Sequence, residues 1–320
     1  MRFAKQLLAL VCALAAGAAA AQGYPSKPVK LVVGFGPGTG SDILGRLLGT
    51  RLSEALGQAV VVENRPGAGG IIGSDSVAKA APDGYTLLLG TNAMLITSPL
   101  LAKVPPYHIE KDFLPVAGVA RTAFALVTGT TPESPRTLAE LVSKAKAGNA
   151  NYASAGQGTI GHLASEVAVR AMSVNATHIP YKGSGQSLTD VARGEVLFAT
   201  DTLAAALPHV RAGRLRAIAV TGESRVQSLP DTPTFGESGV NGVRVYAWWG
   251  IFAPAGTPQE PVRRVEQAVA AVMADADTRK RLAGMEIEPN PMSSARLAEF
   301  IKGEYPFWQR FLAESGIRLE

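Results

Sequence analysis

Two glycine-rich stretches hold the residues of this chain that are best suited to bind an anion. The first runs Gly34-Phe-Gly-Pro-Gly-Thr-Gly-Ser-Asp42 and the second runs Ser154-Ala-Gly-Gln-Gly-Thr-Ile-Gly-His162. Each follows a short apolar run and precedes a helical pattern, which predicts a strand, a loop and a helix start. Glycine lets the backbone approach a ligand closely, and the unpaired N–H groups of a helix start attract negative charge. Two such loops predict one anion that is held from two sides.

A dinucleotide-binding enzyme and a hydrolase are the alternatives that these residue types also allow. Residues 156–161 have the G-x-G-x-x-G spacing, but the next predicted strand ends at 178–180 without the acid that binds a ribose. Ser154, His162 and Asp201 would suit a hydrolase, but no G-x-S-x-G elbow joins a strand to a helix. The histidines lack metal-site spacing. We therefore expect no catalysis, no metal and no cofactor.

The first 21 residues predict export. Residues 1–5 are short and basic, residues 6–17 are mostly apolar, and small residues then offer a cleavage site near Ala21. Cys12 is the one cysteine and lies inside this segment, so the mature chain has no thiol chemistry. The formal net charge of the whole chain is +5, and two of its basic residues belong to the signal. We expect a periplasmic protein with no nucleic-acid partner.

Strand and helix patterns alternate along the rest of the chain. This alternation predicts an α/β fold of mostly parallel sheets flanked by helices. The predicted strands are 30–33, 59–62, 85–89, 114–119, 123–127, 152–154, 177–180, 196–199, 215–220 and 243–252. The predicted helices are 42–56, 71–80, 137–147, 160–172, 184–193, 203–212, 258–274, 277–283, 294–302 and 305–315.

Seven short motifs, in order along the chain, carry a family resemblance. They are Pro25-Ser-Lys-Pro28, Phe35-Gly-Pro-Gly38 with Asp42, Val61-Val-Glu-Asn-Arg-Pro-Gly-Ala-Gly-Gly70, Ala81-Pro-Asp-Gly-Tyr-Thr86, Ala155-Gly-Gln-Gly-Thr159 with His162, Ile179-Pro-Tyr-Lys-Gly183 and Leu229-Pro-Asp-Thr-Pro-Thr-Phe235. Together they resemble the periplasmic solute receptors of tripartite tricarboxylate transporters, the Bug family. The chain departs from the family pattern in two places. The first loop has Thr39 where many relatives carry Pro-Gly-Gly, and Trp248-Trp249 is a double tryptophan where relatives vary.

The resemblance implies a two-lobed, flytrap-like receptor that closes on a small organic acid. We expect residues 22–121 with 222–320 to form one lobe and residues 122–221 to form the other, joined by two hinge strands. The implied partners are a carboxylate ligand and, in transient contact, a membrane transporter. We expect a monomer. The alternative within the family is an adaptor that presents the ligand to a signalling system.

Candidate ligand contacts lie where the predicted strands end. In the first lobe they are Gly36, Pro37, Gly38, Thr39, Ser41, Asp42, Thr91 and Asn92. In the second lobe they are Ser154, Ala155, Gly156, Gly158, Thr159, His162, Tyr181 and Asp201, of which Asp201 resembles an acid found there in relatives.

Several of these candidates also have a structural interpretation. His162 would hold the shape of the second loop by a hydrogen bond. Asp42 and Asp201 would cap helices, the latter with Thr202. Residues 61–70 would be structural, with Arg65 fixing a loop.

Overall fold

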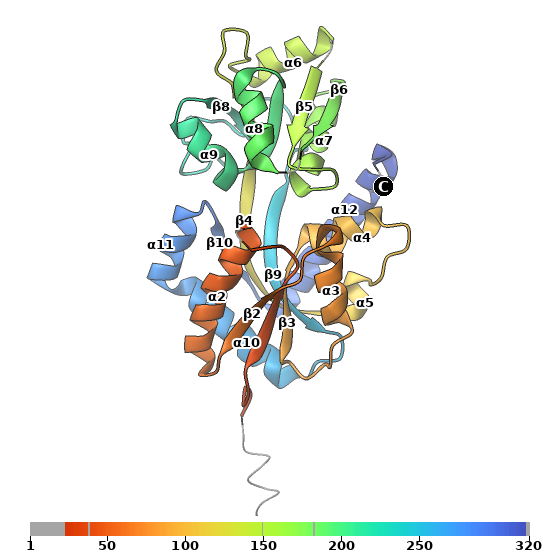
Figure 1. Cartoon of the computed structure of the whole chain (residues 1–320), viewed down its shortest axis with the longest axis vertical. Helices are drawn as coiled ribbons and strands as arrows, with labels where there is room; N and C mark the ends of the chain where they lie inside the picture. The colour runs from red at the N-terminus through yellow and green to blue at the C-terminus, as the bar shows by residue number, and fades with distance from the viewer. Residues whose placement is uncertain (1–22, 38, 149, 182, 318–320) are drawn as a thin grey trace, which may run out of the picture.

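Two lobes, stacked along the long axis of the molecule, make up the described chain (Figure 1). The computed structural model describes residues 23–317 except 38, 149 and 182. The predicted signal peptide and Gly38 therefore lie outside the described residues. Among those that are described, no helix combines the length and the apolar character needed to cross a bilayer.

The sheet of the lower lobe has the strand order β2-β1-β3-β9-β4, with β10 on the other side of β4. The strands are β1 (Val29–Val33), β2 (Val60–Asn64), β3 (Thr86–Thr91), β4 (Phe113–Gly129), β9 (Tyr246–Pro254) and β10 (Glu288–Met292). The helices of this lobe are α2 (Gly40–Leu56), α3 (Ile71–Ala78), α4 (Ser98–Leu101), α5 (Ile109–Asp112), α10 (Gln259–Ala274), α11 (Ala276–Gly284) and α12 (Ser294–Ser315), with short turns η1 (Ala68–Gly70) and η2 (Ala93–Thr97).

The upper lobe repeats this layered plan on a smaller scale. Its strands are β5 (Ala150–Ser154), β6 (Ala176–Pro180), β7 (Phe198–Thr202) and β8 (Leu215–Val220), and they pair in the order β6-β5-β7-β4-β8. Its helices are α6 (Leu138–Lys146), α7 (Ile160–Ala171), α8 (Ser184–Arg193) and α9 (Leu203–Arg211). The two-lobed α/β fold that the sequence predicts is confirmed.

The strand directions are mixed, and not mostly parallel as the sequence predicts. β1 is parallel to β2 and β3, and β5 is parallel to β6 and β7, as expected. β4 runs antiparallel to each of its partners, and β9 is antiparallel to β3. The antiparallel pairs arise because β4 carries the chain from the lower lobe to the upper one and β9 brings it back.

β4 is one strand where the sequence predicts two, at 114–119 and 123–127. Its first part, from Phe113 to Ala123, pairs with β9, and its second part, from Phe124 to Gly129, pairs with β7 and β8. The polar pair Arg121-Thr122 looks like a break in the sequence, but it marks the place where the strand changes partners. β4 therefore belongs to both sheets (Figure 1).

A threonine joins the segments that meet between the lobes. The Thr221 hydroxyl accepts a hydrogen bond from the Phe124 amide at 3.0 Å and donates to the Val245 carbonyl at 2.5 Å. The Thr221 amide donates to the Phe124 carbonyl at 3.0 Å. Val226 and Leu229 still pack on the apolar cluster of the upper lobe, which favours a lobe boundary nearer Val245 than the expected residue 222.

The C-terminal helix also differs from its prediction. The sequence pattern predicts helices at 294–302 and 305–315, because Gly303 lies between them and Pro306 suits the first turn of the second. The structure shows one helix, α12, with Pro306 inside it. Packing holds this helix together: Trp308 is buried, and its indole N–H donates to the Glu304 carboxylate at 3.1 Å.

Candidate ligand-binding site

The two glycine-rich loops have the same hydrogen-bond pattern. The Thr39 hydroxyl donates to the Gly36 carbonyl at 2.8 Å and accepts from the Asp42 amide at 3.3 Å. The Thr159 hydroxyl donates to the Gly156 carbonyl at 2.8 Å and accepts from the His162 amide at 3.3 Å. Each threonine thus closes its loop and caps the helix that follows, α2 or α7.

Each threonine hydroxyl accepts from the third backbone amide of its helix and leaves the first two outside this bond. In α7 these are the amides of Ile160 and Gly161, and in α2 they are those of Gly40 and Ser41. None of the four has an acceptor among the described residues. Such N–H groups carry partial positive charge and are suited to bind a carboxylate.

A cavity of about 610 Å³ lies between the lobes in front of the second loop. The upper lobe contributes the loop itself, and the lower lobe contributes the residues after β1 and β3 and the turn η1. The lining residues are Phe35, Ala68, Gly69, Ile71, Ala93, Ser98, Ala102, Lys103, Gln157, Gly158, Thr159 and Ile160. The cavity is the place where the start of α7 faces the opposite lobe.

This cavity includes part of the predicted site. Gly158 and Thr159 line it, whereas the first loop reaches it through Phe35 and not through Gly36, Pro37 or Thr39. Ala68 and Gly69 line it too, although the motif at residues 61–70 predicts a structural role for them. In this motif glycines precede the start of α3. A glycine-rich loop before a helix is the same sequence signal that identifies the two predicted loops, and it could have identified Ala68 and Gly69 as well.

The side chains at the start of α2 are engaged with the protein. Ser41 is buried and its hydroxyl accepts from the Trp249 indole at 2.9 Å. Asp42 is 3% exposed, and its carboxylate accepts from Arg46 at 3.1 Å and from Asn64 at 2.9 Å. The expectation that Asp42 caps the helix is wrong, because Thr39 occupies the capping position.

Thr91 and Asn92 hold the end of β3. The Thr91 hydroxyl accepts from the Met94 amide at 3.2 Å. The Asn92 side chain accepts from the Ala93 amide at 3.1 Å and donates to the Tyr246 carbonyl of β9 at 2.7 Å. Both residues are buried and neither lines the cavity, so their bonds position η2 against the returning hinge strand.

Two stacked histidines support the second loop from behind. His162 Nδ1 accepts from the Gly158 amide at 3.1 Å, which confirms its predicted loop-holding role. Its ring lies 3.8 Å from the His178 ring at an interplanar angle of 11°, and His178 Nε2 lies 2.7 Å from the Ser154 hydroxyl. Burial, together with the neighbouring His178, lowers the pKa of His162 to about 3, and burial lowers the pKa of His178 to about 4. Both rings are therefore neutral at neutral pH.

The remaining candidates of the upper lobe also bond within it. The Tyr181 hydroxyl donates to Asp190 at 2.8 Å, and burial raises the pKa of Tyr181 to about 12. Asp201 accepts from the Thr202 amide at 2.7 Å, and burial raises the pKa of its carboxyl group. Thr202, not Asp201, caps α9. Ala155 and Gly156 lie in the loop but do not line the cavity.

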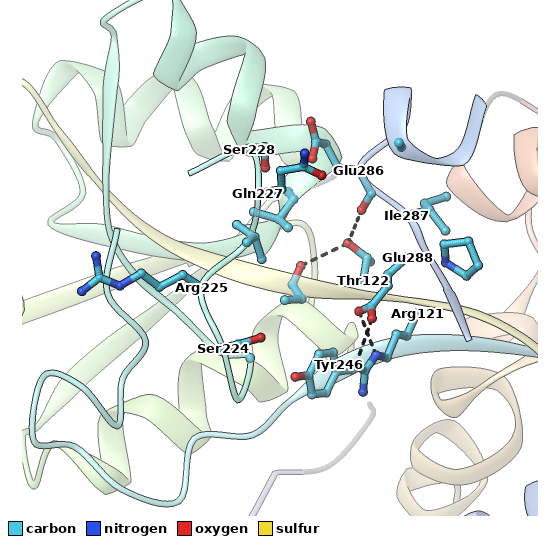
Figure 2. Close-up of a pocket in the computed structure, with 16 residues that line it drawn as sticks. Arg121, Thr122, Ser224, Arg225, Gln227, Ser228, Tyr246, Glu286, Ile287 and Glu288 are labelled. Atoms are coloured by element: carbon cyan, nitrogen blue, oxygen red, sulfur yellow. Dashed lines mark hydrogen bonds and ion pairs between the residues drawn. The ribbon is translucent and has the colours of Figure 1, made fainter. Parts of the chain in front are cut away.

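A second hollow, of about 450 Å³, lies beside β4 and β10 (Figure 2). Arg121 binds Glu288 through two hydrogen bonds, at 3.0 and 3.2 Å, and lies over the Tyr246 ring. The Thr122 hydroxyl donates to the Glu286 carbonyl at 2.9 Å. These charges are paired with one another, and no residue of the predicted site lines this hollow.

The geometry favours binding over catalysis. The structure pairs Ser154 with His178 rather than with His162, and the 2% exposure of Ser154 keeps its hydroxyl away from a substrate. Asp201 bonds to Thr202 and not to a histidine. Within the described ranges no group of three metal-ligating side chains forms a site.

Known proteins resemble this chain over nearly its whole length. The model of the tripartite tricarboxylate transporter family receptor matches residues 44–317. A UPF0065 protein of Pseudomonas sp. (strain P51) is 36% identical, covering 91% of this chain and 87% of that protein. A solved R. palustris protein with adipate is 35% identical, with a TM-score of 0.81, and the match covers 92% of this chain and 99% of that one. MatC from Rhodopseudomonas palustris with bound malate is 32% identical, with a TM-score of 0.78, over 90% of this chain and 100% of that one.

Proposed function

Because this chain belongs to the tripartite tricarboxylate transporter receptor family, whose members are solute receptors and not enzymes, we propose that it binds a small carboxylate between its lobes. In this proposal the loaded receptor delivers the acid to a membrane transporter. The protein acts in the periplasm as a monomer, after cleavage near Ala21.

The cavity in front of α7 is the observation that supports this proposal best. Ile160 lines the cavity, and its amide and that of the neighbouring Gly161 have no acceptor in the described part of the chain, while Thr159 fixes the loop before them. Phe35 and η1 close the cavity from the other lobe, so the ligand contacts both lobes at once. A ligand that bridges two lobes favours the closed state in proportion to its better affinity for that state.

A binding screen of residues 22–320 tests the proposal. The melting temperature is measured against di- and tricarboxylates, acidic amino acids and aromatic acids. A ligand present at about 100 times its Kd adds about 2.7 kcal/mol to the free energy of unfolding. Mass spectrometry after hours of incubation should then recover the acid unchanged. Stabilisation by a dinucleotide or a metal, with none by any acid, would contradict the proposal.

A variant pair locates the site. Thr159→Val removes the cap at the cavity, and Thr137→Val removes a cap of the same kind at the start of α6, where Thr137 accepts from the Glu140 amide at 3.2 Å. Both variants lose helix capping, but only the first should weaken the binding of the best acid. Equal affinity of both variants would place the site elsewhere.

A further inference from the structure

The wall of the interlobe cavity is largely hydrocarbon. Phe35 and Ile71 of the lower lobe and Ile160 of the upper lobe are its large side chains, and Ala68, Ala93 and Ala102 fill the space between them. A carbon chain or ring placed there loses its contact with water, which stabilises the complex in proportion to the apolar area covered.

The hydroxyl groups on this wall already donate within the protein. Thr159 donates to the Gly156 carbonyl at 2.8 Å and Ser98 donates to the Gly69 carbonyl at 3.3 Å. No carboxylate stands among the described residues that line the cavity. The side-chain acceptors on this wall are therefore limited to the oxygens of Thr159, Ser98 and Gln157. A ligand hydroxyl buried against the apolar remainder of the wall would lack a partner, which weakens binding.

The charge on the wall is positive. Lys103 is the one charged side chain among the lining residues that the structure describes. It is exposed and belongs to the lower lobe, whereas the start of α7 belongs to the upper lobe. The ammonium group of Lys103 and the amide of Ile160, the first residue of α7, both attract carboxylates. The cavity thus has anion-attracting groups at its polar positions and hydrocarbon between them.

We propose that the ligand is a carboxylate with an unsubstituted hydrocarbon body, and that the receptor discriminates against hydroxylated acids of the same carbon skeleton. This inference rests on the proposed function and narrows its substrate class. The hydrocarbon body packs on Phe35, Ile71 and Ile160, while a hydroxyl at the same position would be stripped of water without a new partner.

Matched pairs of acids that differ by one hydroxyl test this proposal. Isothermal titration calorimetry compares succinate with malate, glutarate with 2-hydroxyglutarate, and tricarballylate with citrate. The unsubstituted acid should bind at least about tenfold more tightly in every pair that binds, which corresponds to about 1.4 kcal/mol. If a hydroxylated acid binds as tightly as its partner, the inference is overturned and the proposed function stands. If none of these acids and none of the wider acid panel binds, both are overturned.

A variant that adds a hydroxyl to the wall provides the complementary test. Ala93 lines the cavity at the start of η2 and is only partly buried. Ala93→Ser should raise the affinity for the hydroxylated acid relative to its partner by about three- to tenfold. Ala205→Ser, on α9 outside the cavity, is the matched control and should leave the ratio unchanged. An unchanged ratio in Ala93→Ser would overturn the assignment of this wall to the ligand.

Discussion

Thr39 and Thr159 make the same hydrogen bonds in different lobes. Each hydroxyl donates to the carbonyl of the glycine three residues before it, and each accepts from the amide three residues after it. The carbonyls of the two threonines also accept from the amides of Ile43 and Leu163, at 2.9 and 3.0 Å. The lobes therefore use one loop design twice, and only the copy with Thr159 lines the cavity.

This relationship predicts different effects for the same substitution. Thr39→Val and Thr159→Val should each lower the free energy of unfolding by about 1 kcal/mol, because each loses a helix cap. Thr159→Val should also weaken ligand binding more than Thr39→Val does. Urea unfolding and calorimetry measure the two effects. Thr159→Ser keeps the hydroxyl and should retain both stability and affinity, and loss of affinity in this variant would contradict the capping account.

Gly158 should not tolerate a side chain. Its φ of 74° lies in the left-handed region, where an L-residue costs about 1–2 kcal/mol. Gly158→Ala should therefore be destabilised by roughly that amount and should bind ligand less well. Gly213 has a φ of 68° in a turn that does not line the cavity, so Gly213→Ala should show a similar loss of stability with unchanged affinity. Full affinity in Gly158→Ala would show that the shape of this loop does not matter for binding.

The stacked histidines predict a loss of stability in acid. Their pKa values in the folded protein, about 3 for His162 and about 4 for His178, lie below the usual 6.5 because burial disfavours the charged rings. As the pH falls through 6.5, the unfolded chain takes up protons that the folded protein does not bind until the pH approaches these lower values. The free energy of unfolding should decrease over this window.

Urea unfolding from pH 7 to ~4.5 measures this dependence. His178→Gln removes one of the two titrating rings and should flatten the slope. His209 has a lowered pKa as well, through burial and Arg214, so His209→Gln shows what a histidine outside the stack contributes. A slope in His178→Gln that equals the wild-type slope would contradict the assignment to the stack.

Thr221 should be important for the connection between the lobes. Thr221→Val leaves the buried amide of Phe124 and the carbonyl of Val245 without their partner, which should cost about 1–3 kcal/mol of stability. Thr221→Ser keeps the hydroxyl and should lose much less. Thermal unfolding compares the two variants, and equal losses would show that the methyl group, rather than the hydroxyl, matters at this position.

The sequence predicts elements better than it predicts the partners of polar side chains. The limits of α8 at 184–193 and of β8 at 215–220 agree with the pattern, because each element carries its own local signal. The bond from Trp249 to Ser41 joins residues 208 positions apart. Packing across the sheet creates that bond, and no local pattern shows it, so Ser41 remained a ligand candidate.

The cavity wall illustrates the same limit. Glycine and threonine signal the second loop, but Phe35, Ile71 and Ala93 look like ordinary apolar residues of three separate segments. They meet only because β2, β1 and β3 are parallel neighbours that end at the same edge of the sheet. Their role depends on topology, which the composition of a short segment does not show.

The continuity of β4 has a consequence for protein engineering. A fragment limited to either lobe would lack part of a 17-residue strand that both sheets share, so it would expose an unpaired edge. The lobes are therefore not interchangeable modules for building a biosensor. A reporter domain should be inserted at a surface turn such as Gly213 or Gly239, where an added side chain meets no other atom within 4 Å, and any signal would then have to pass through the paired strands β4 and β9 that join the lobes.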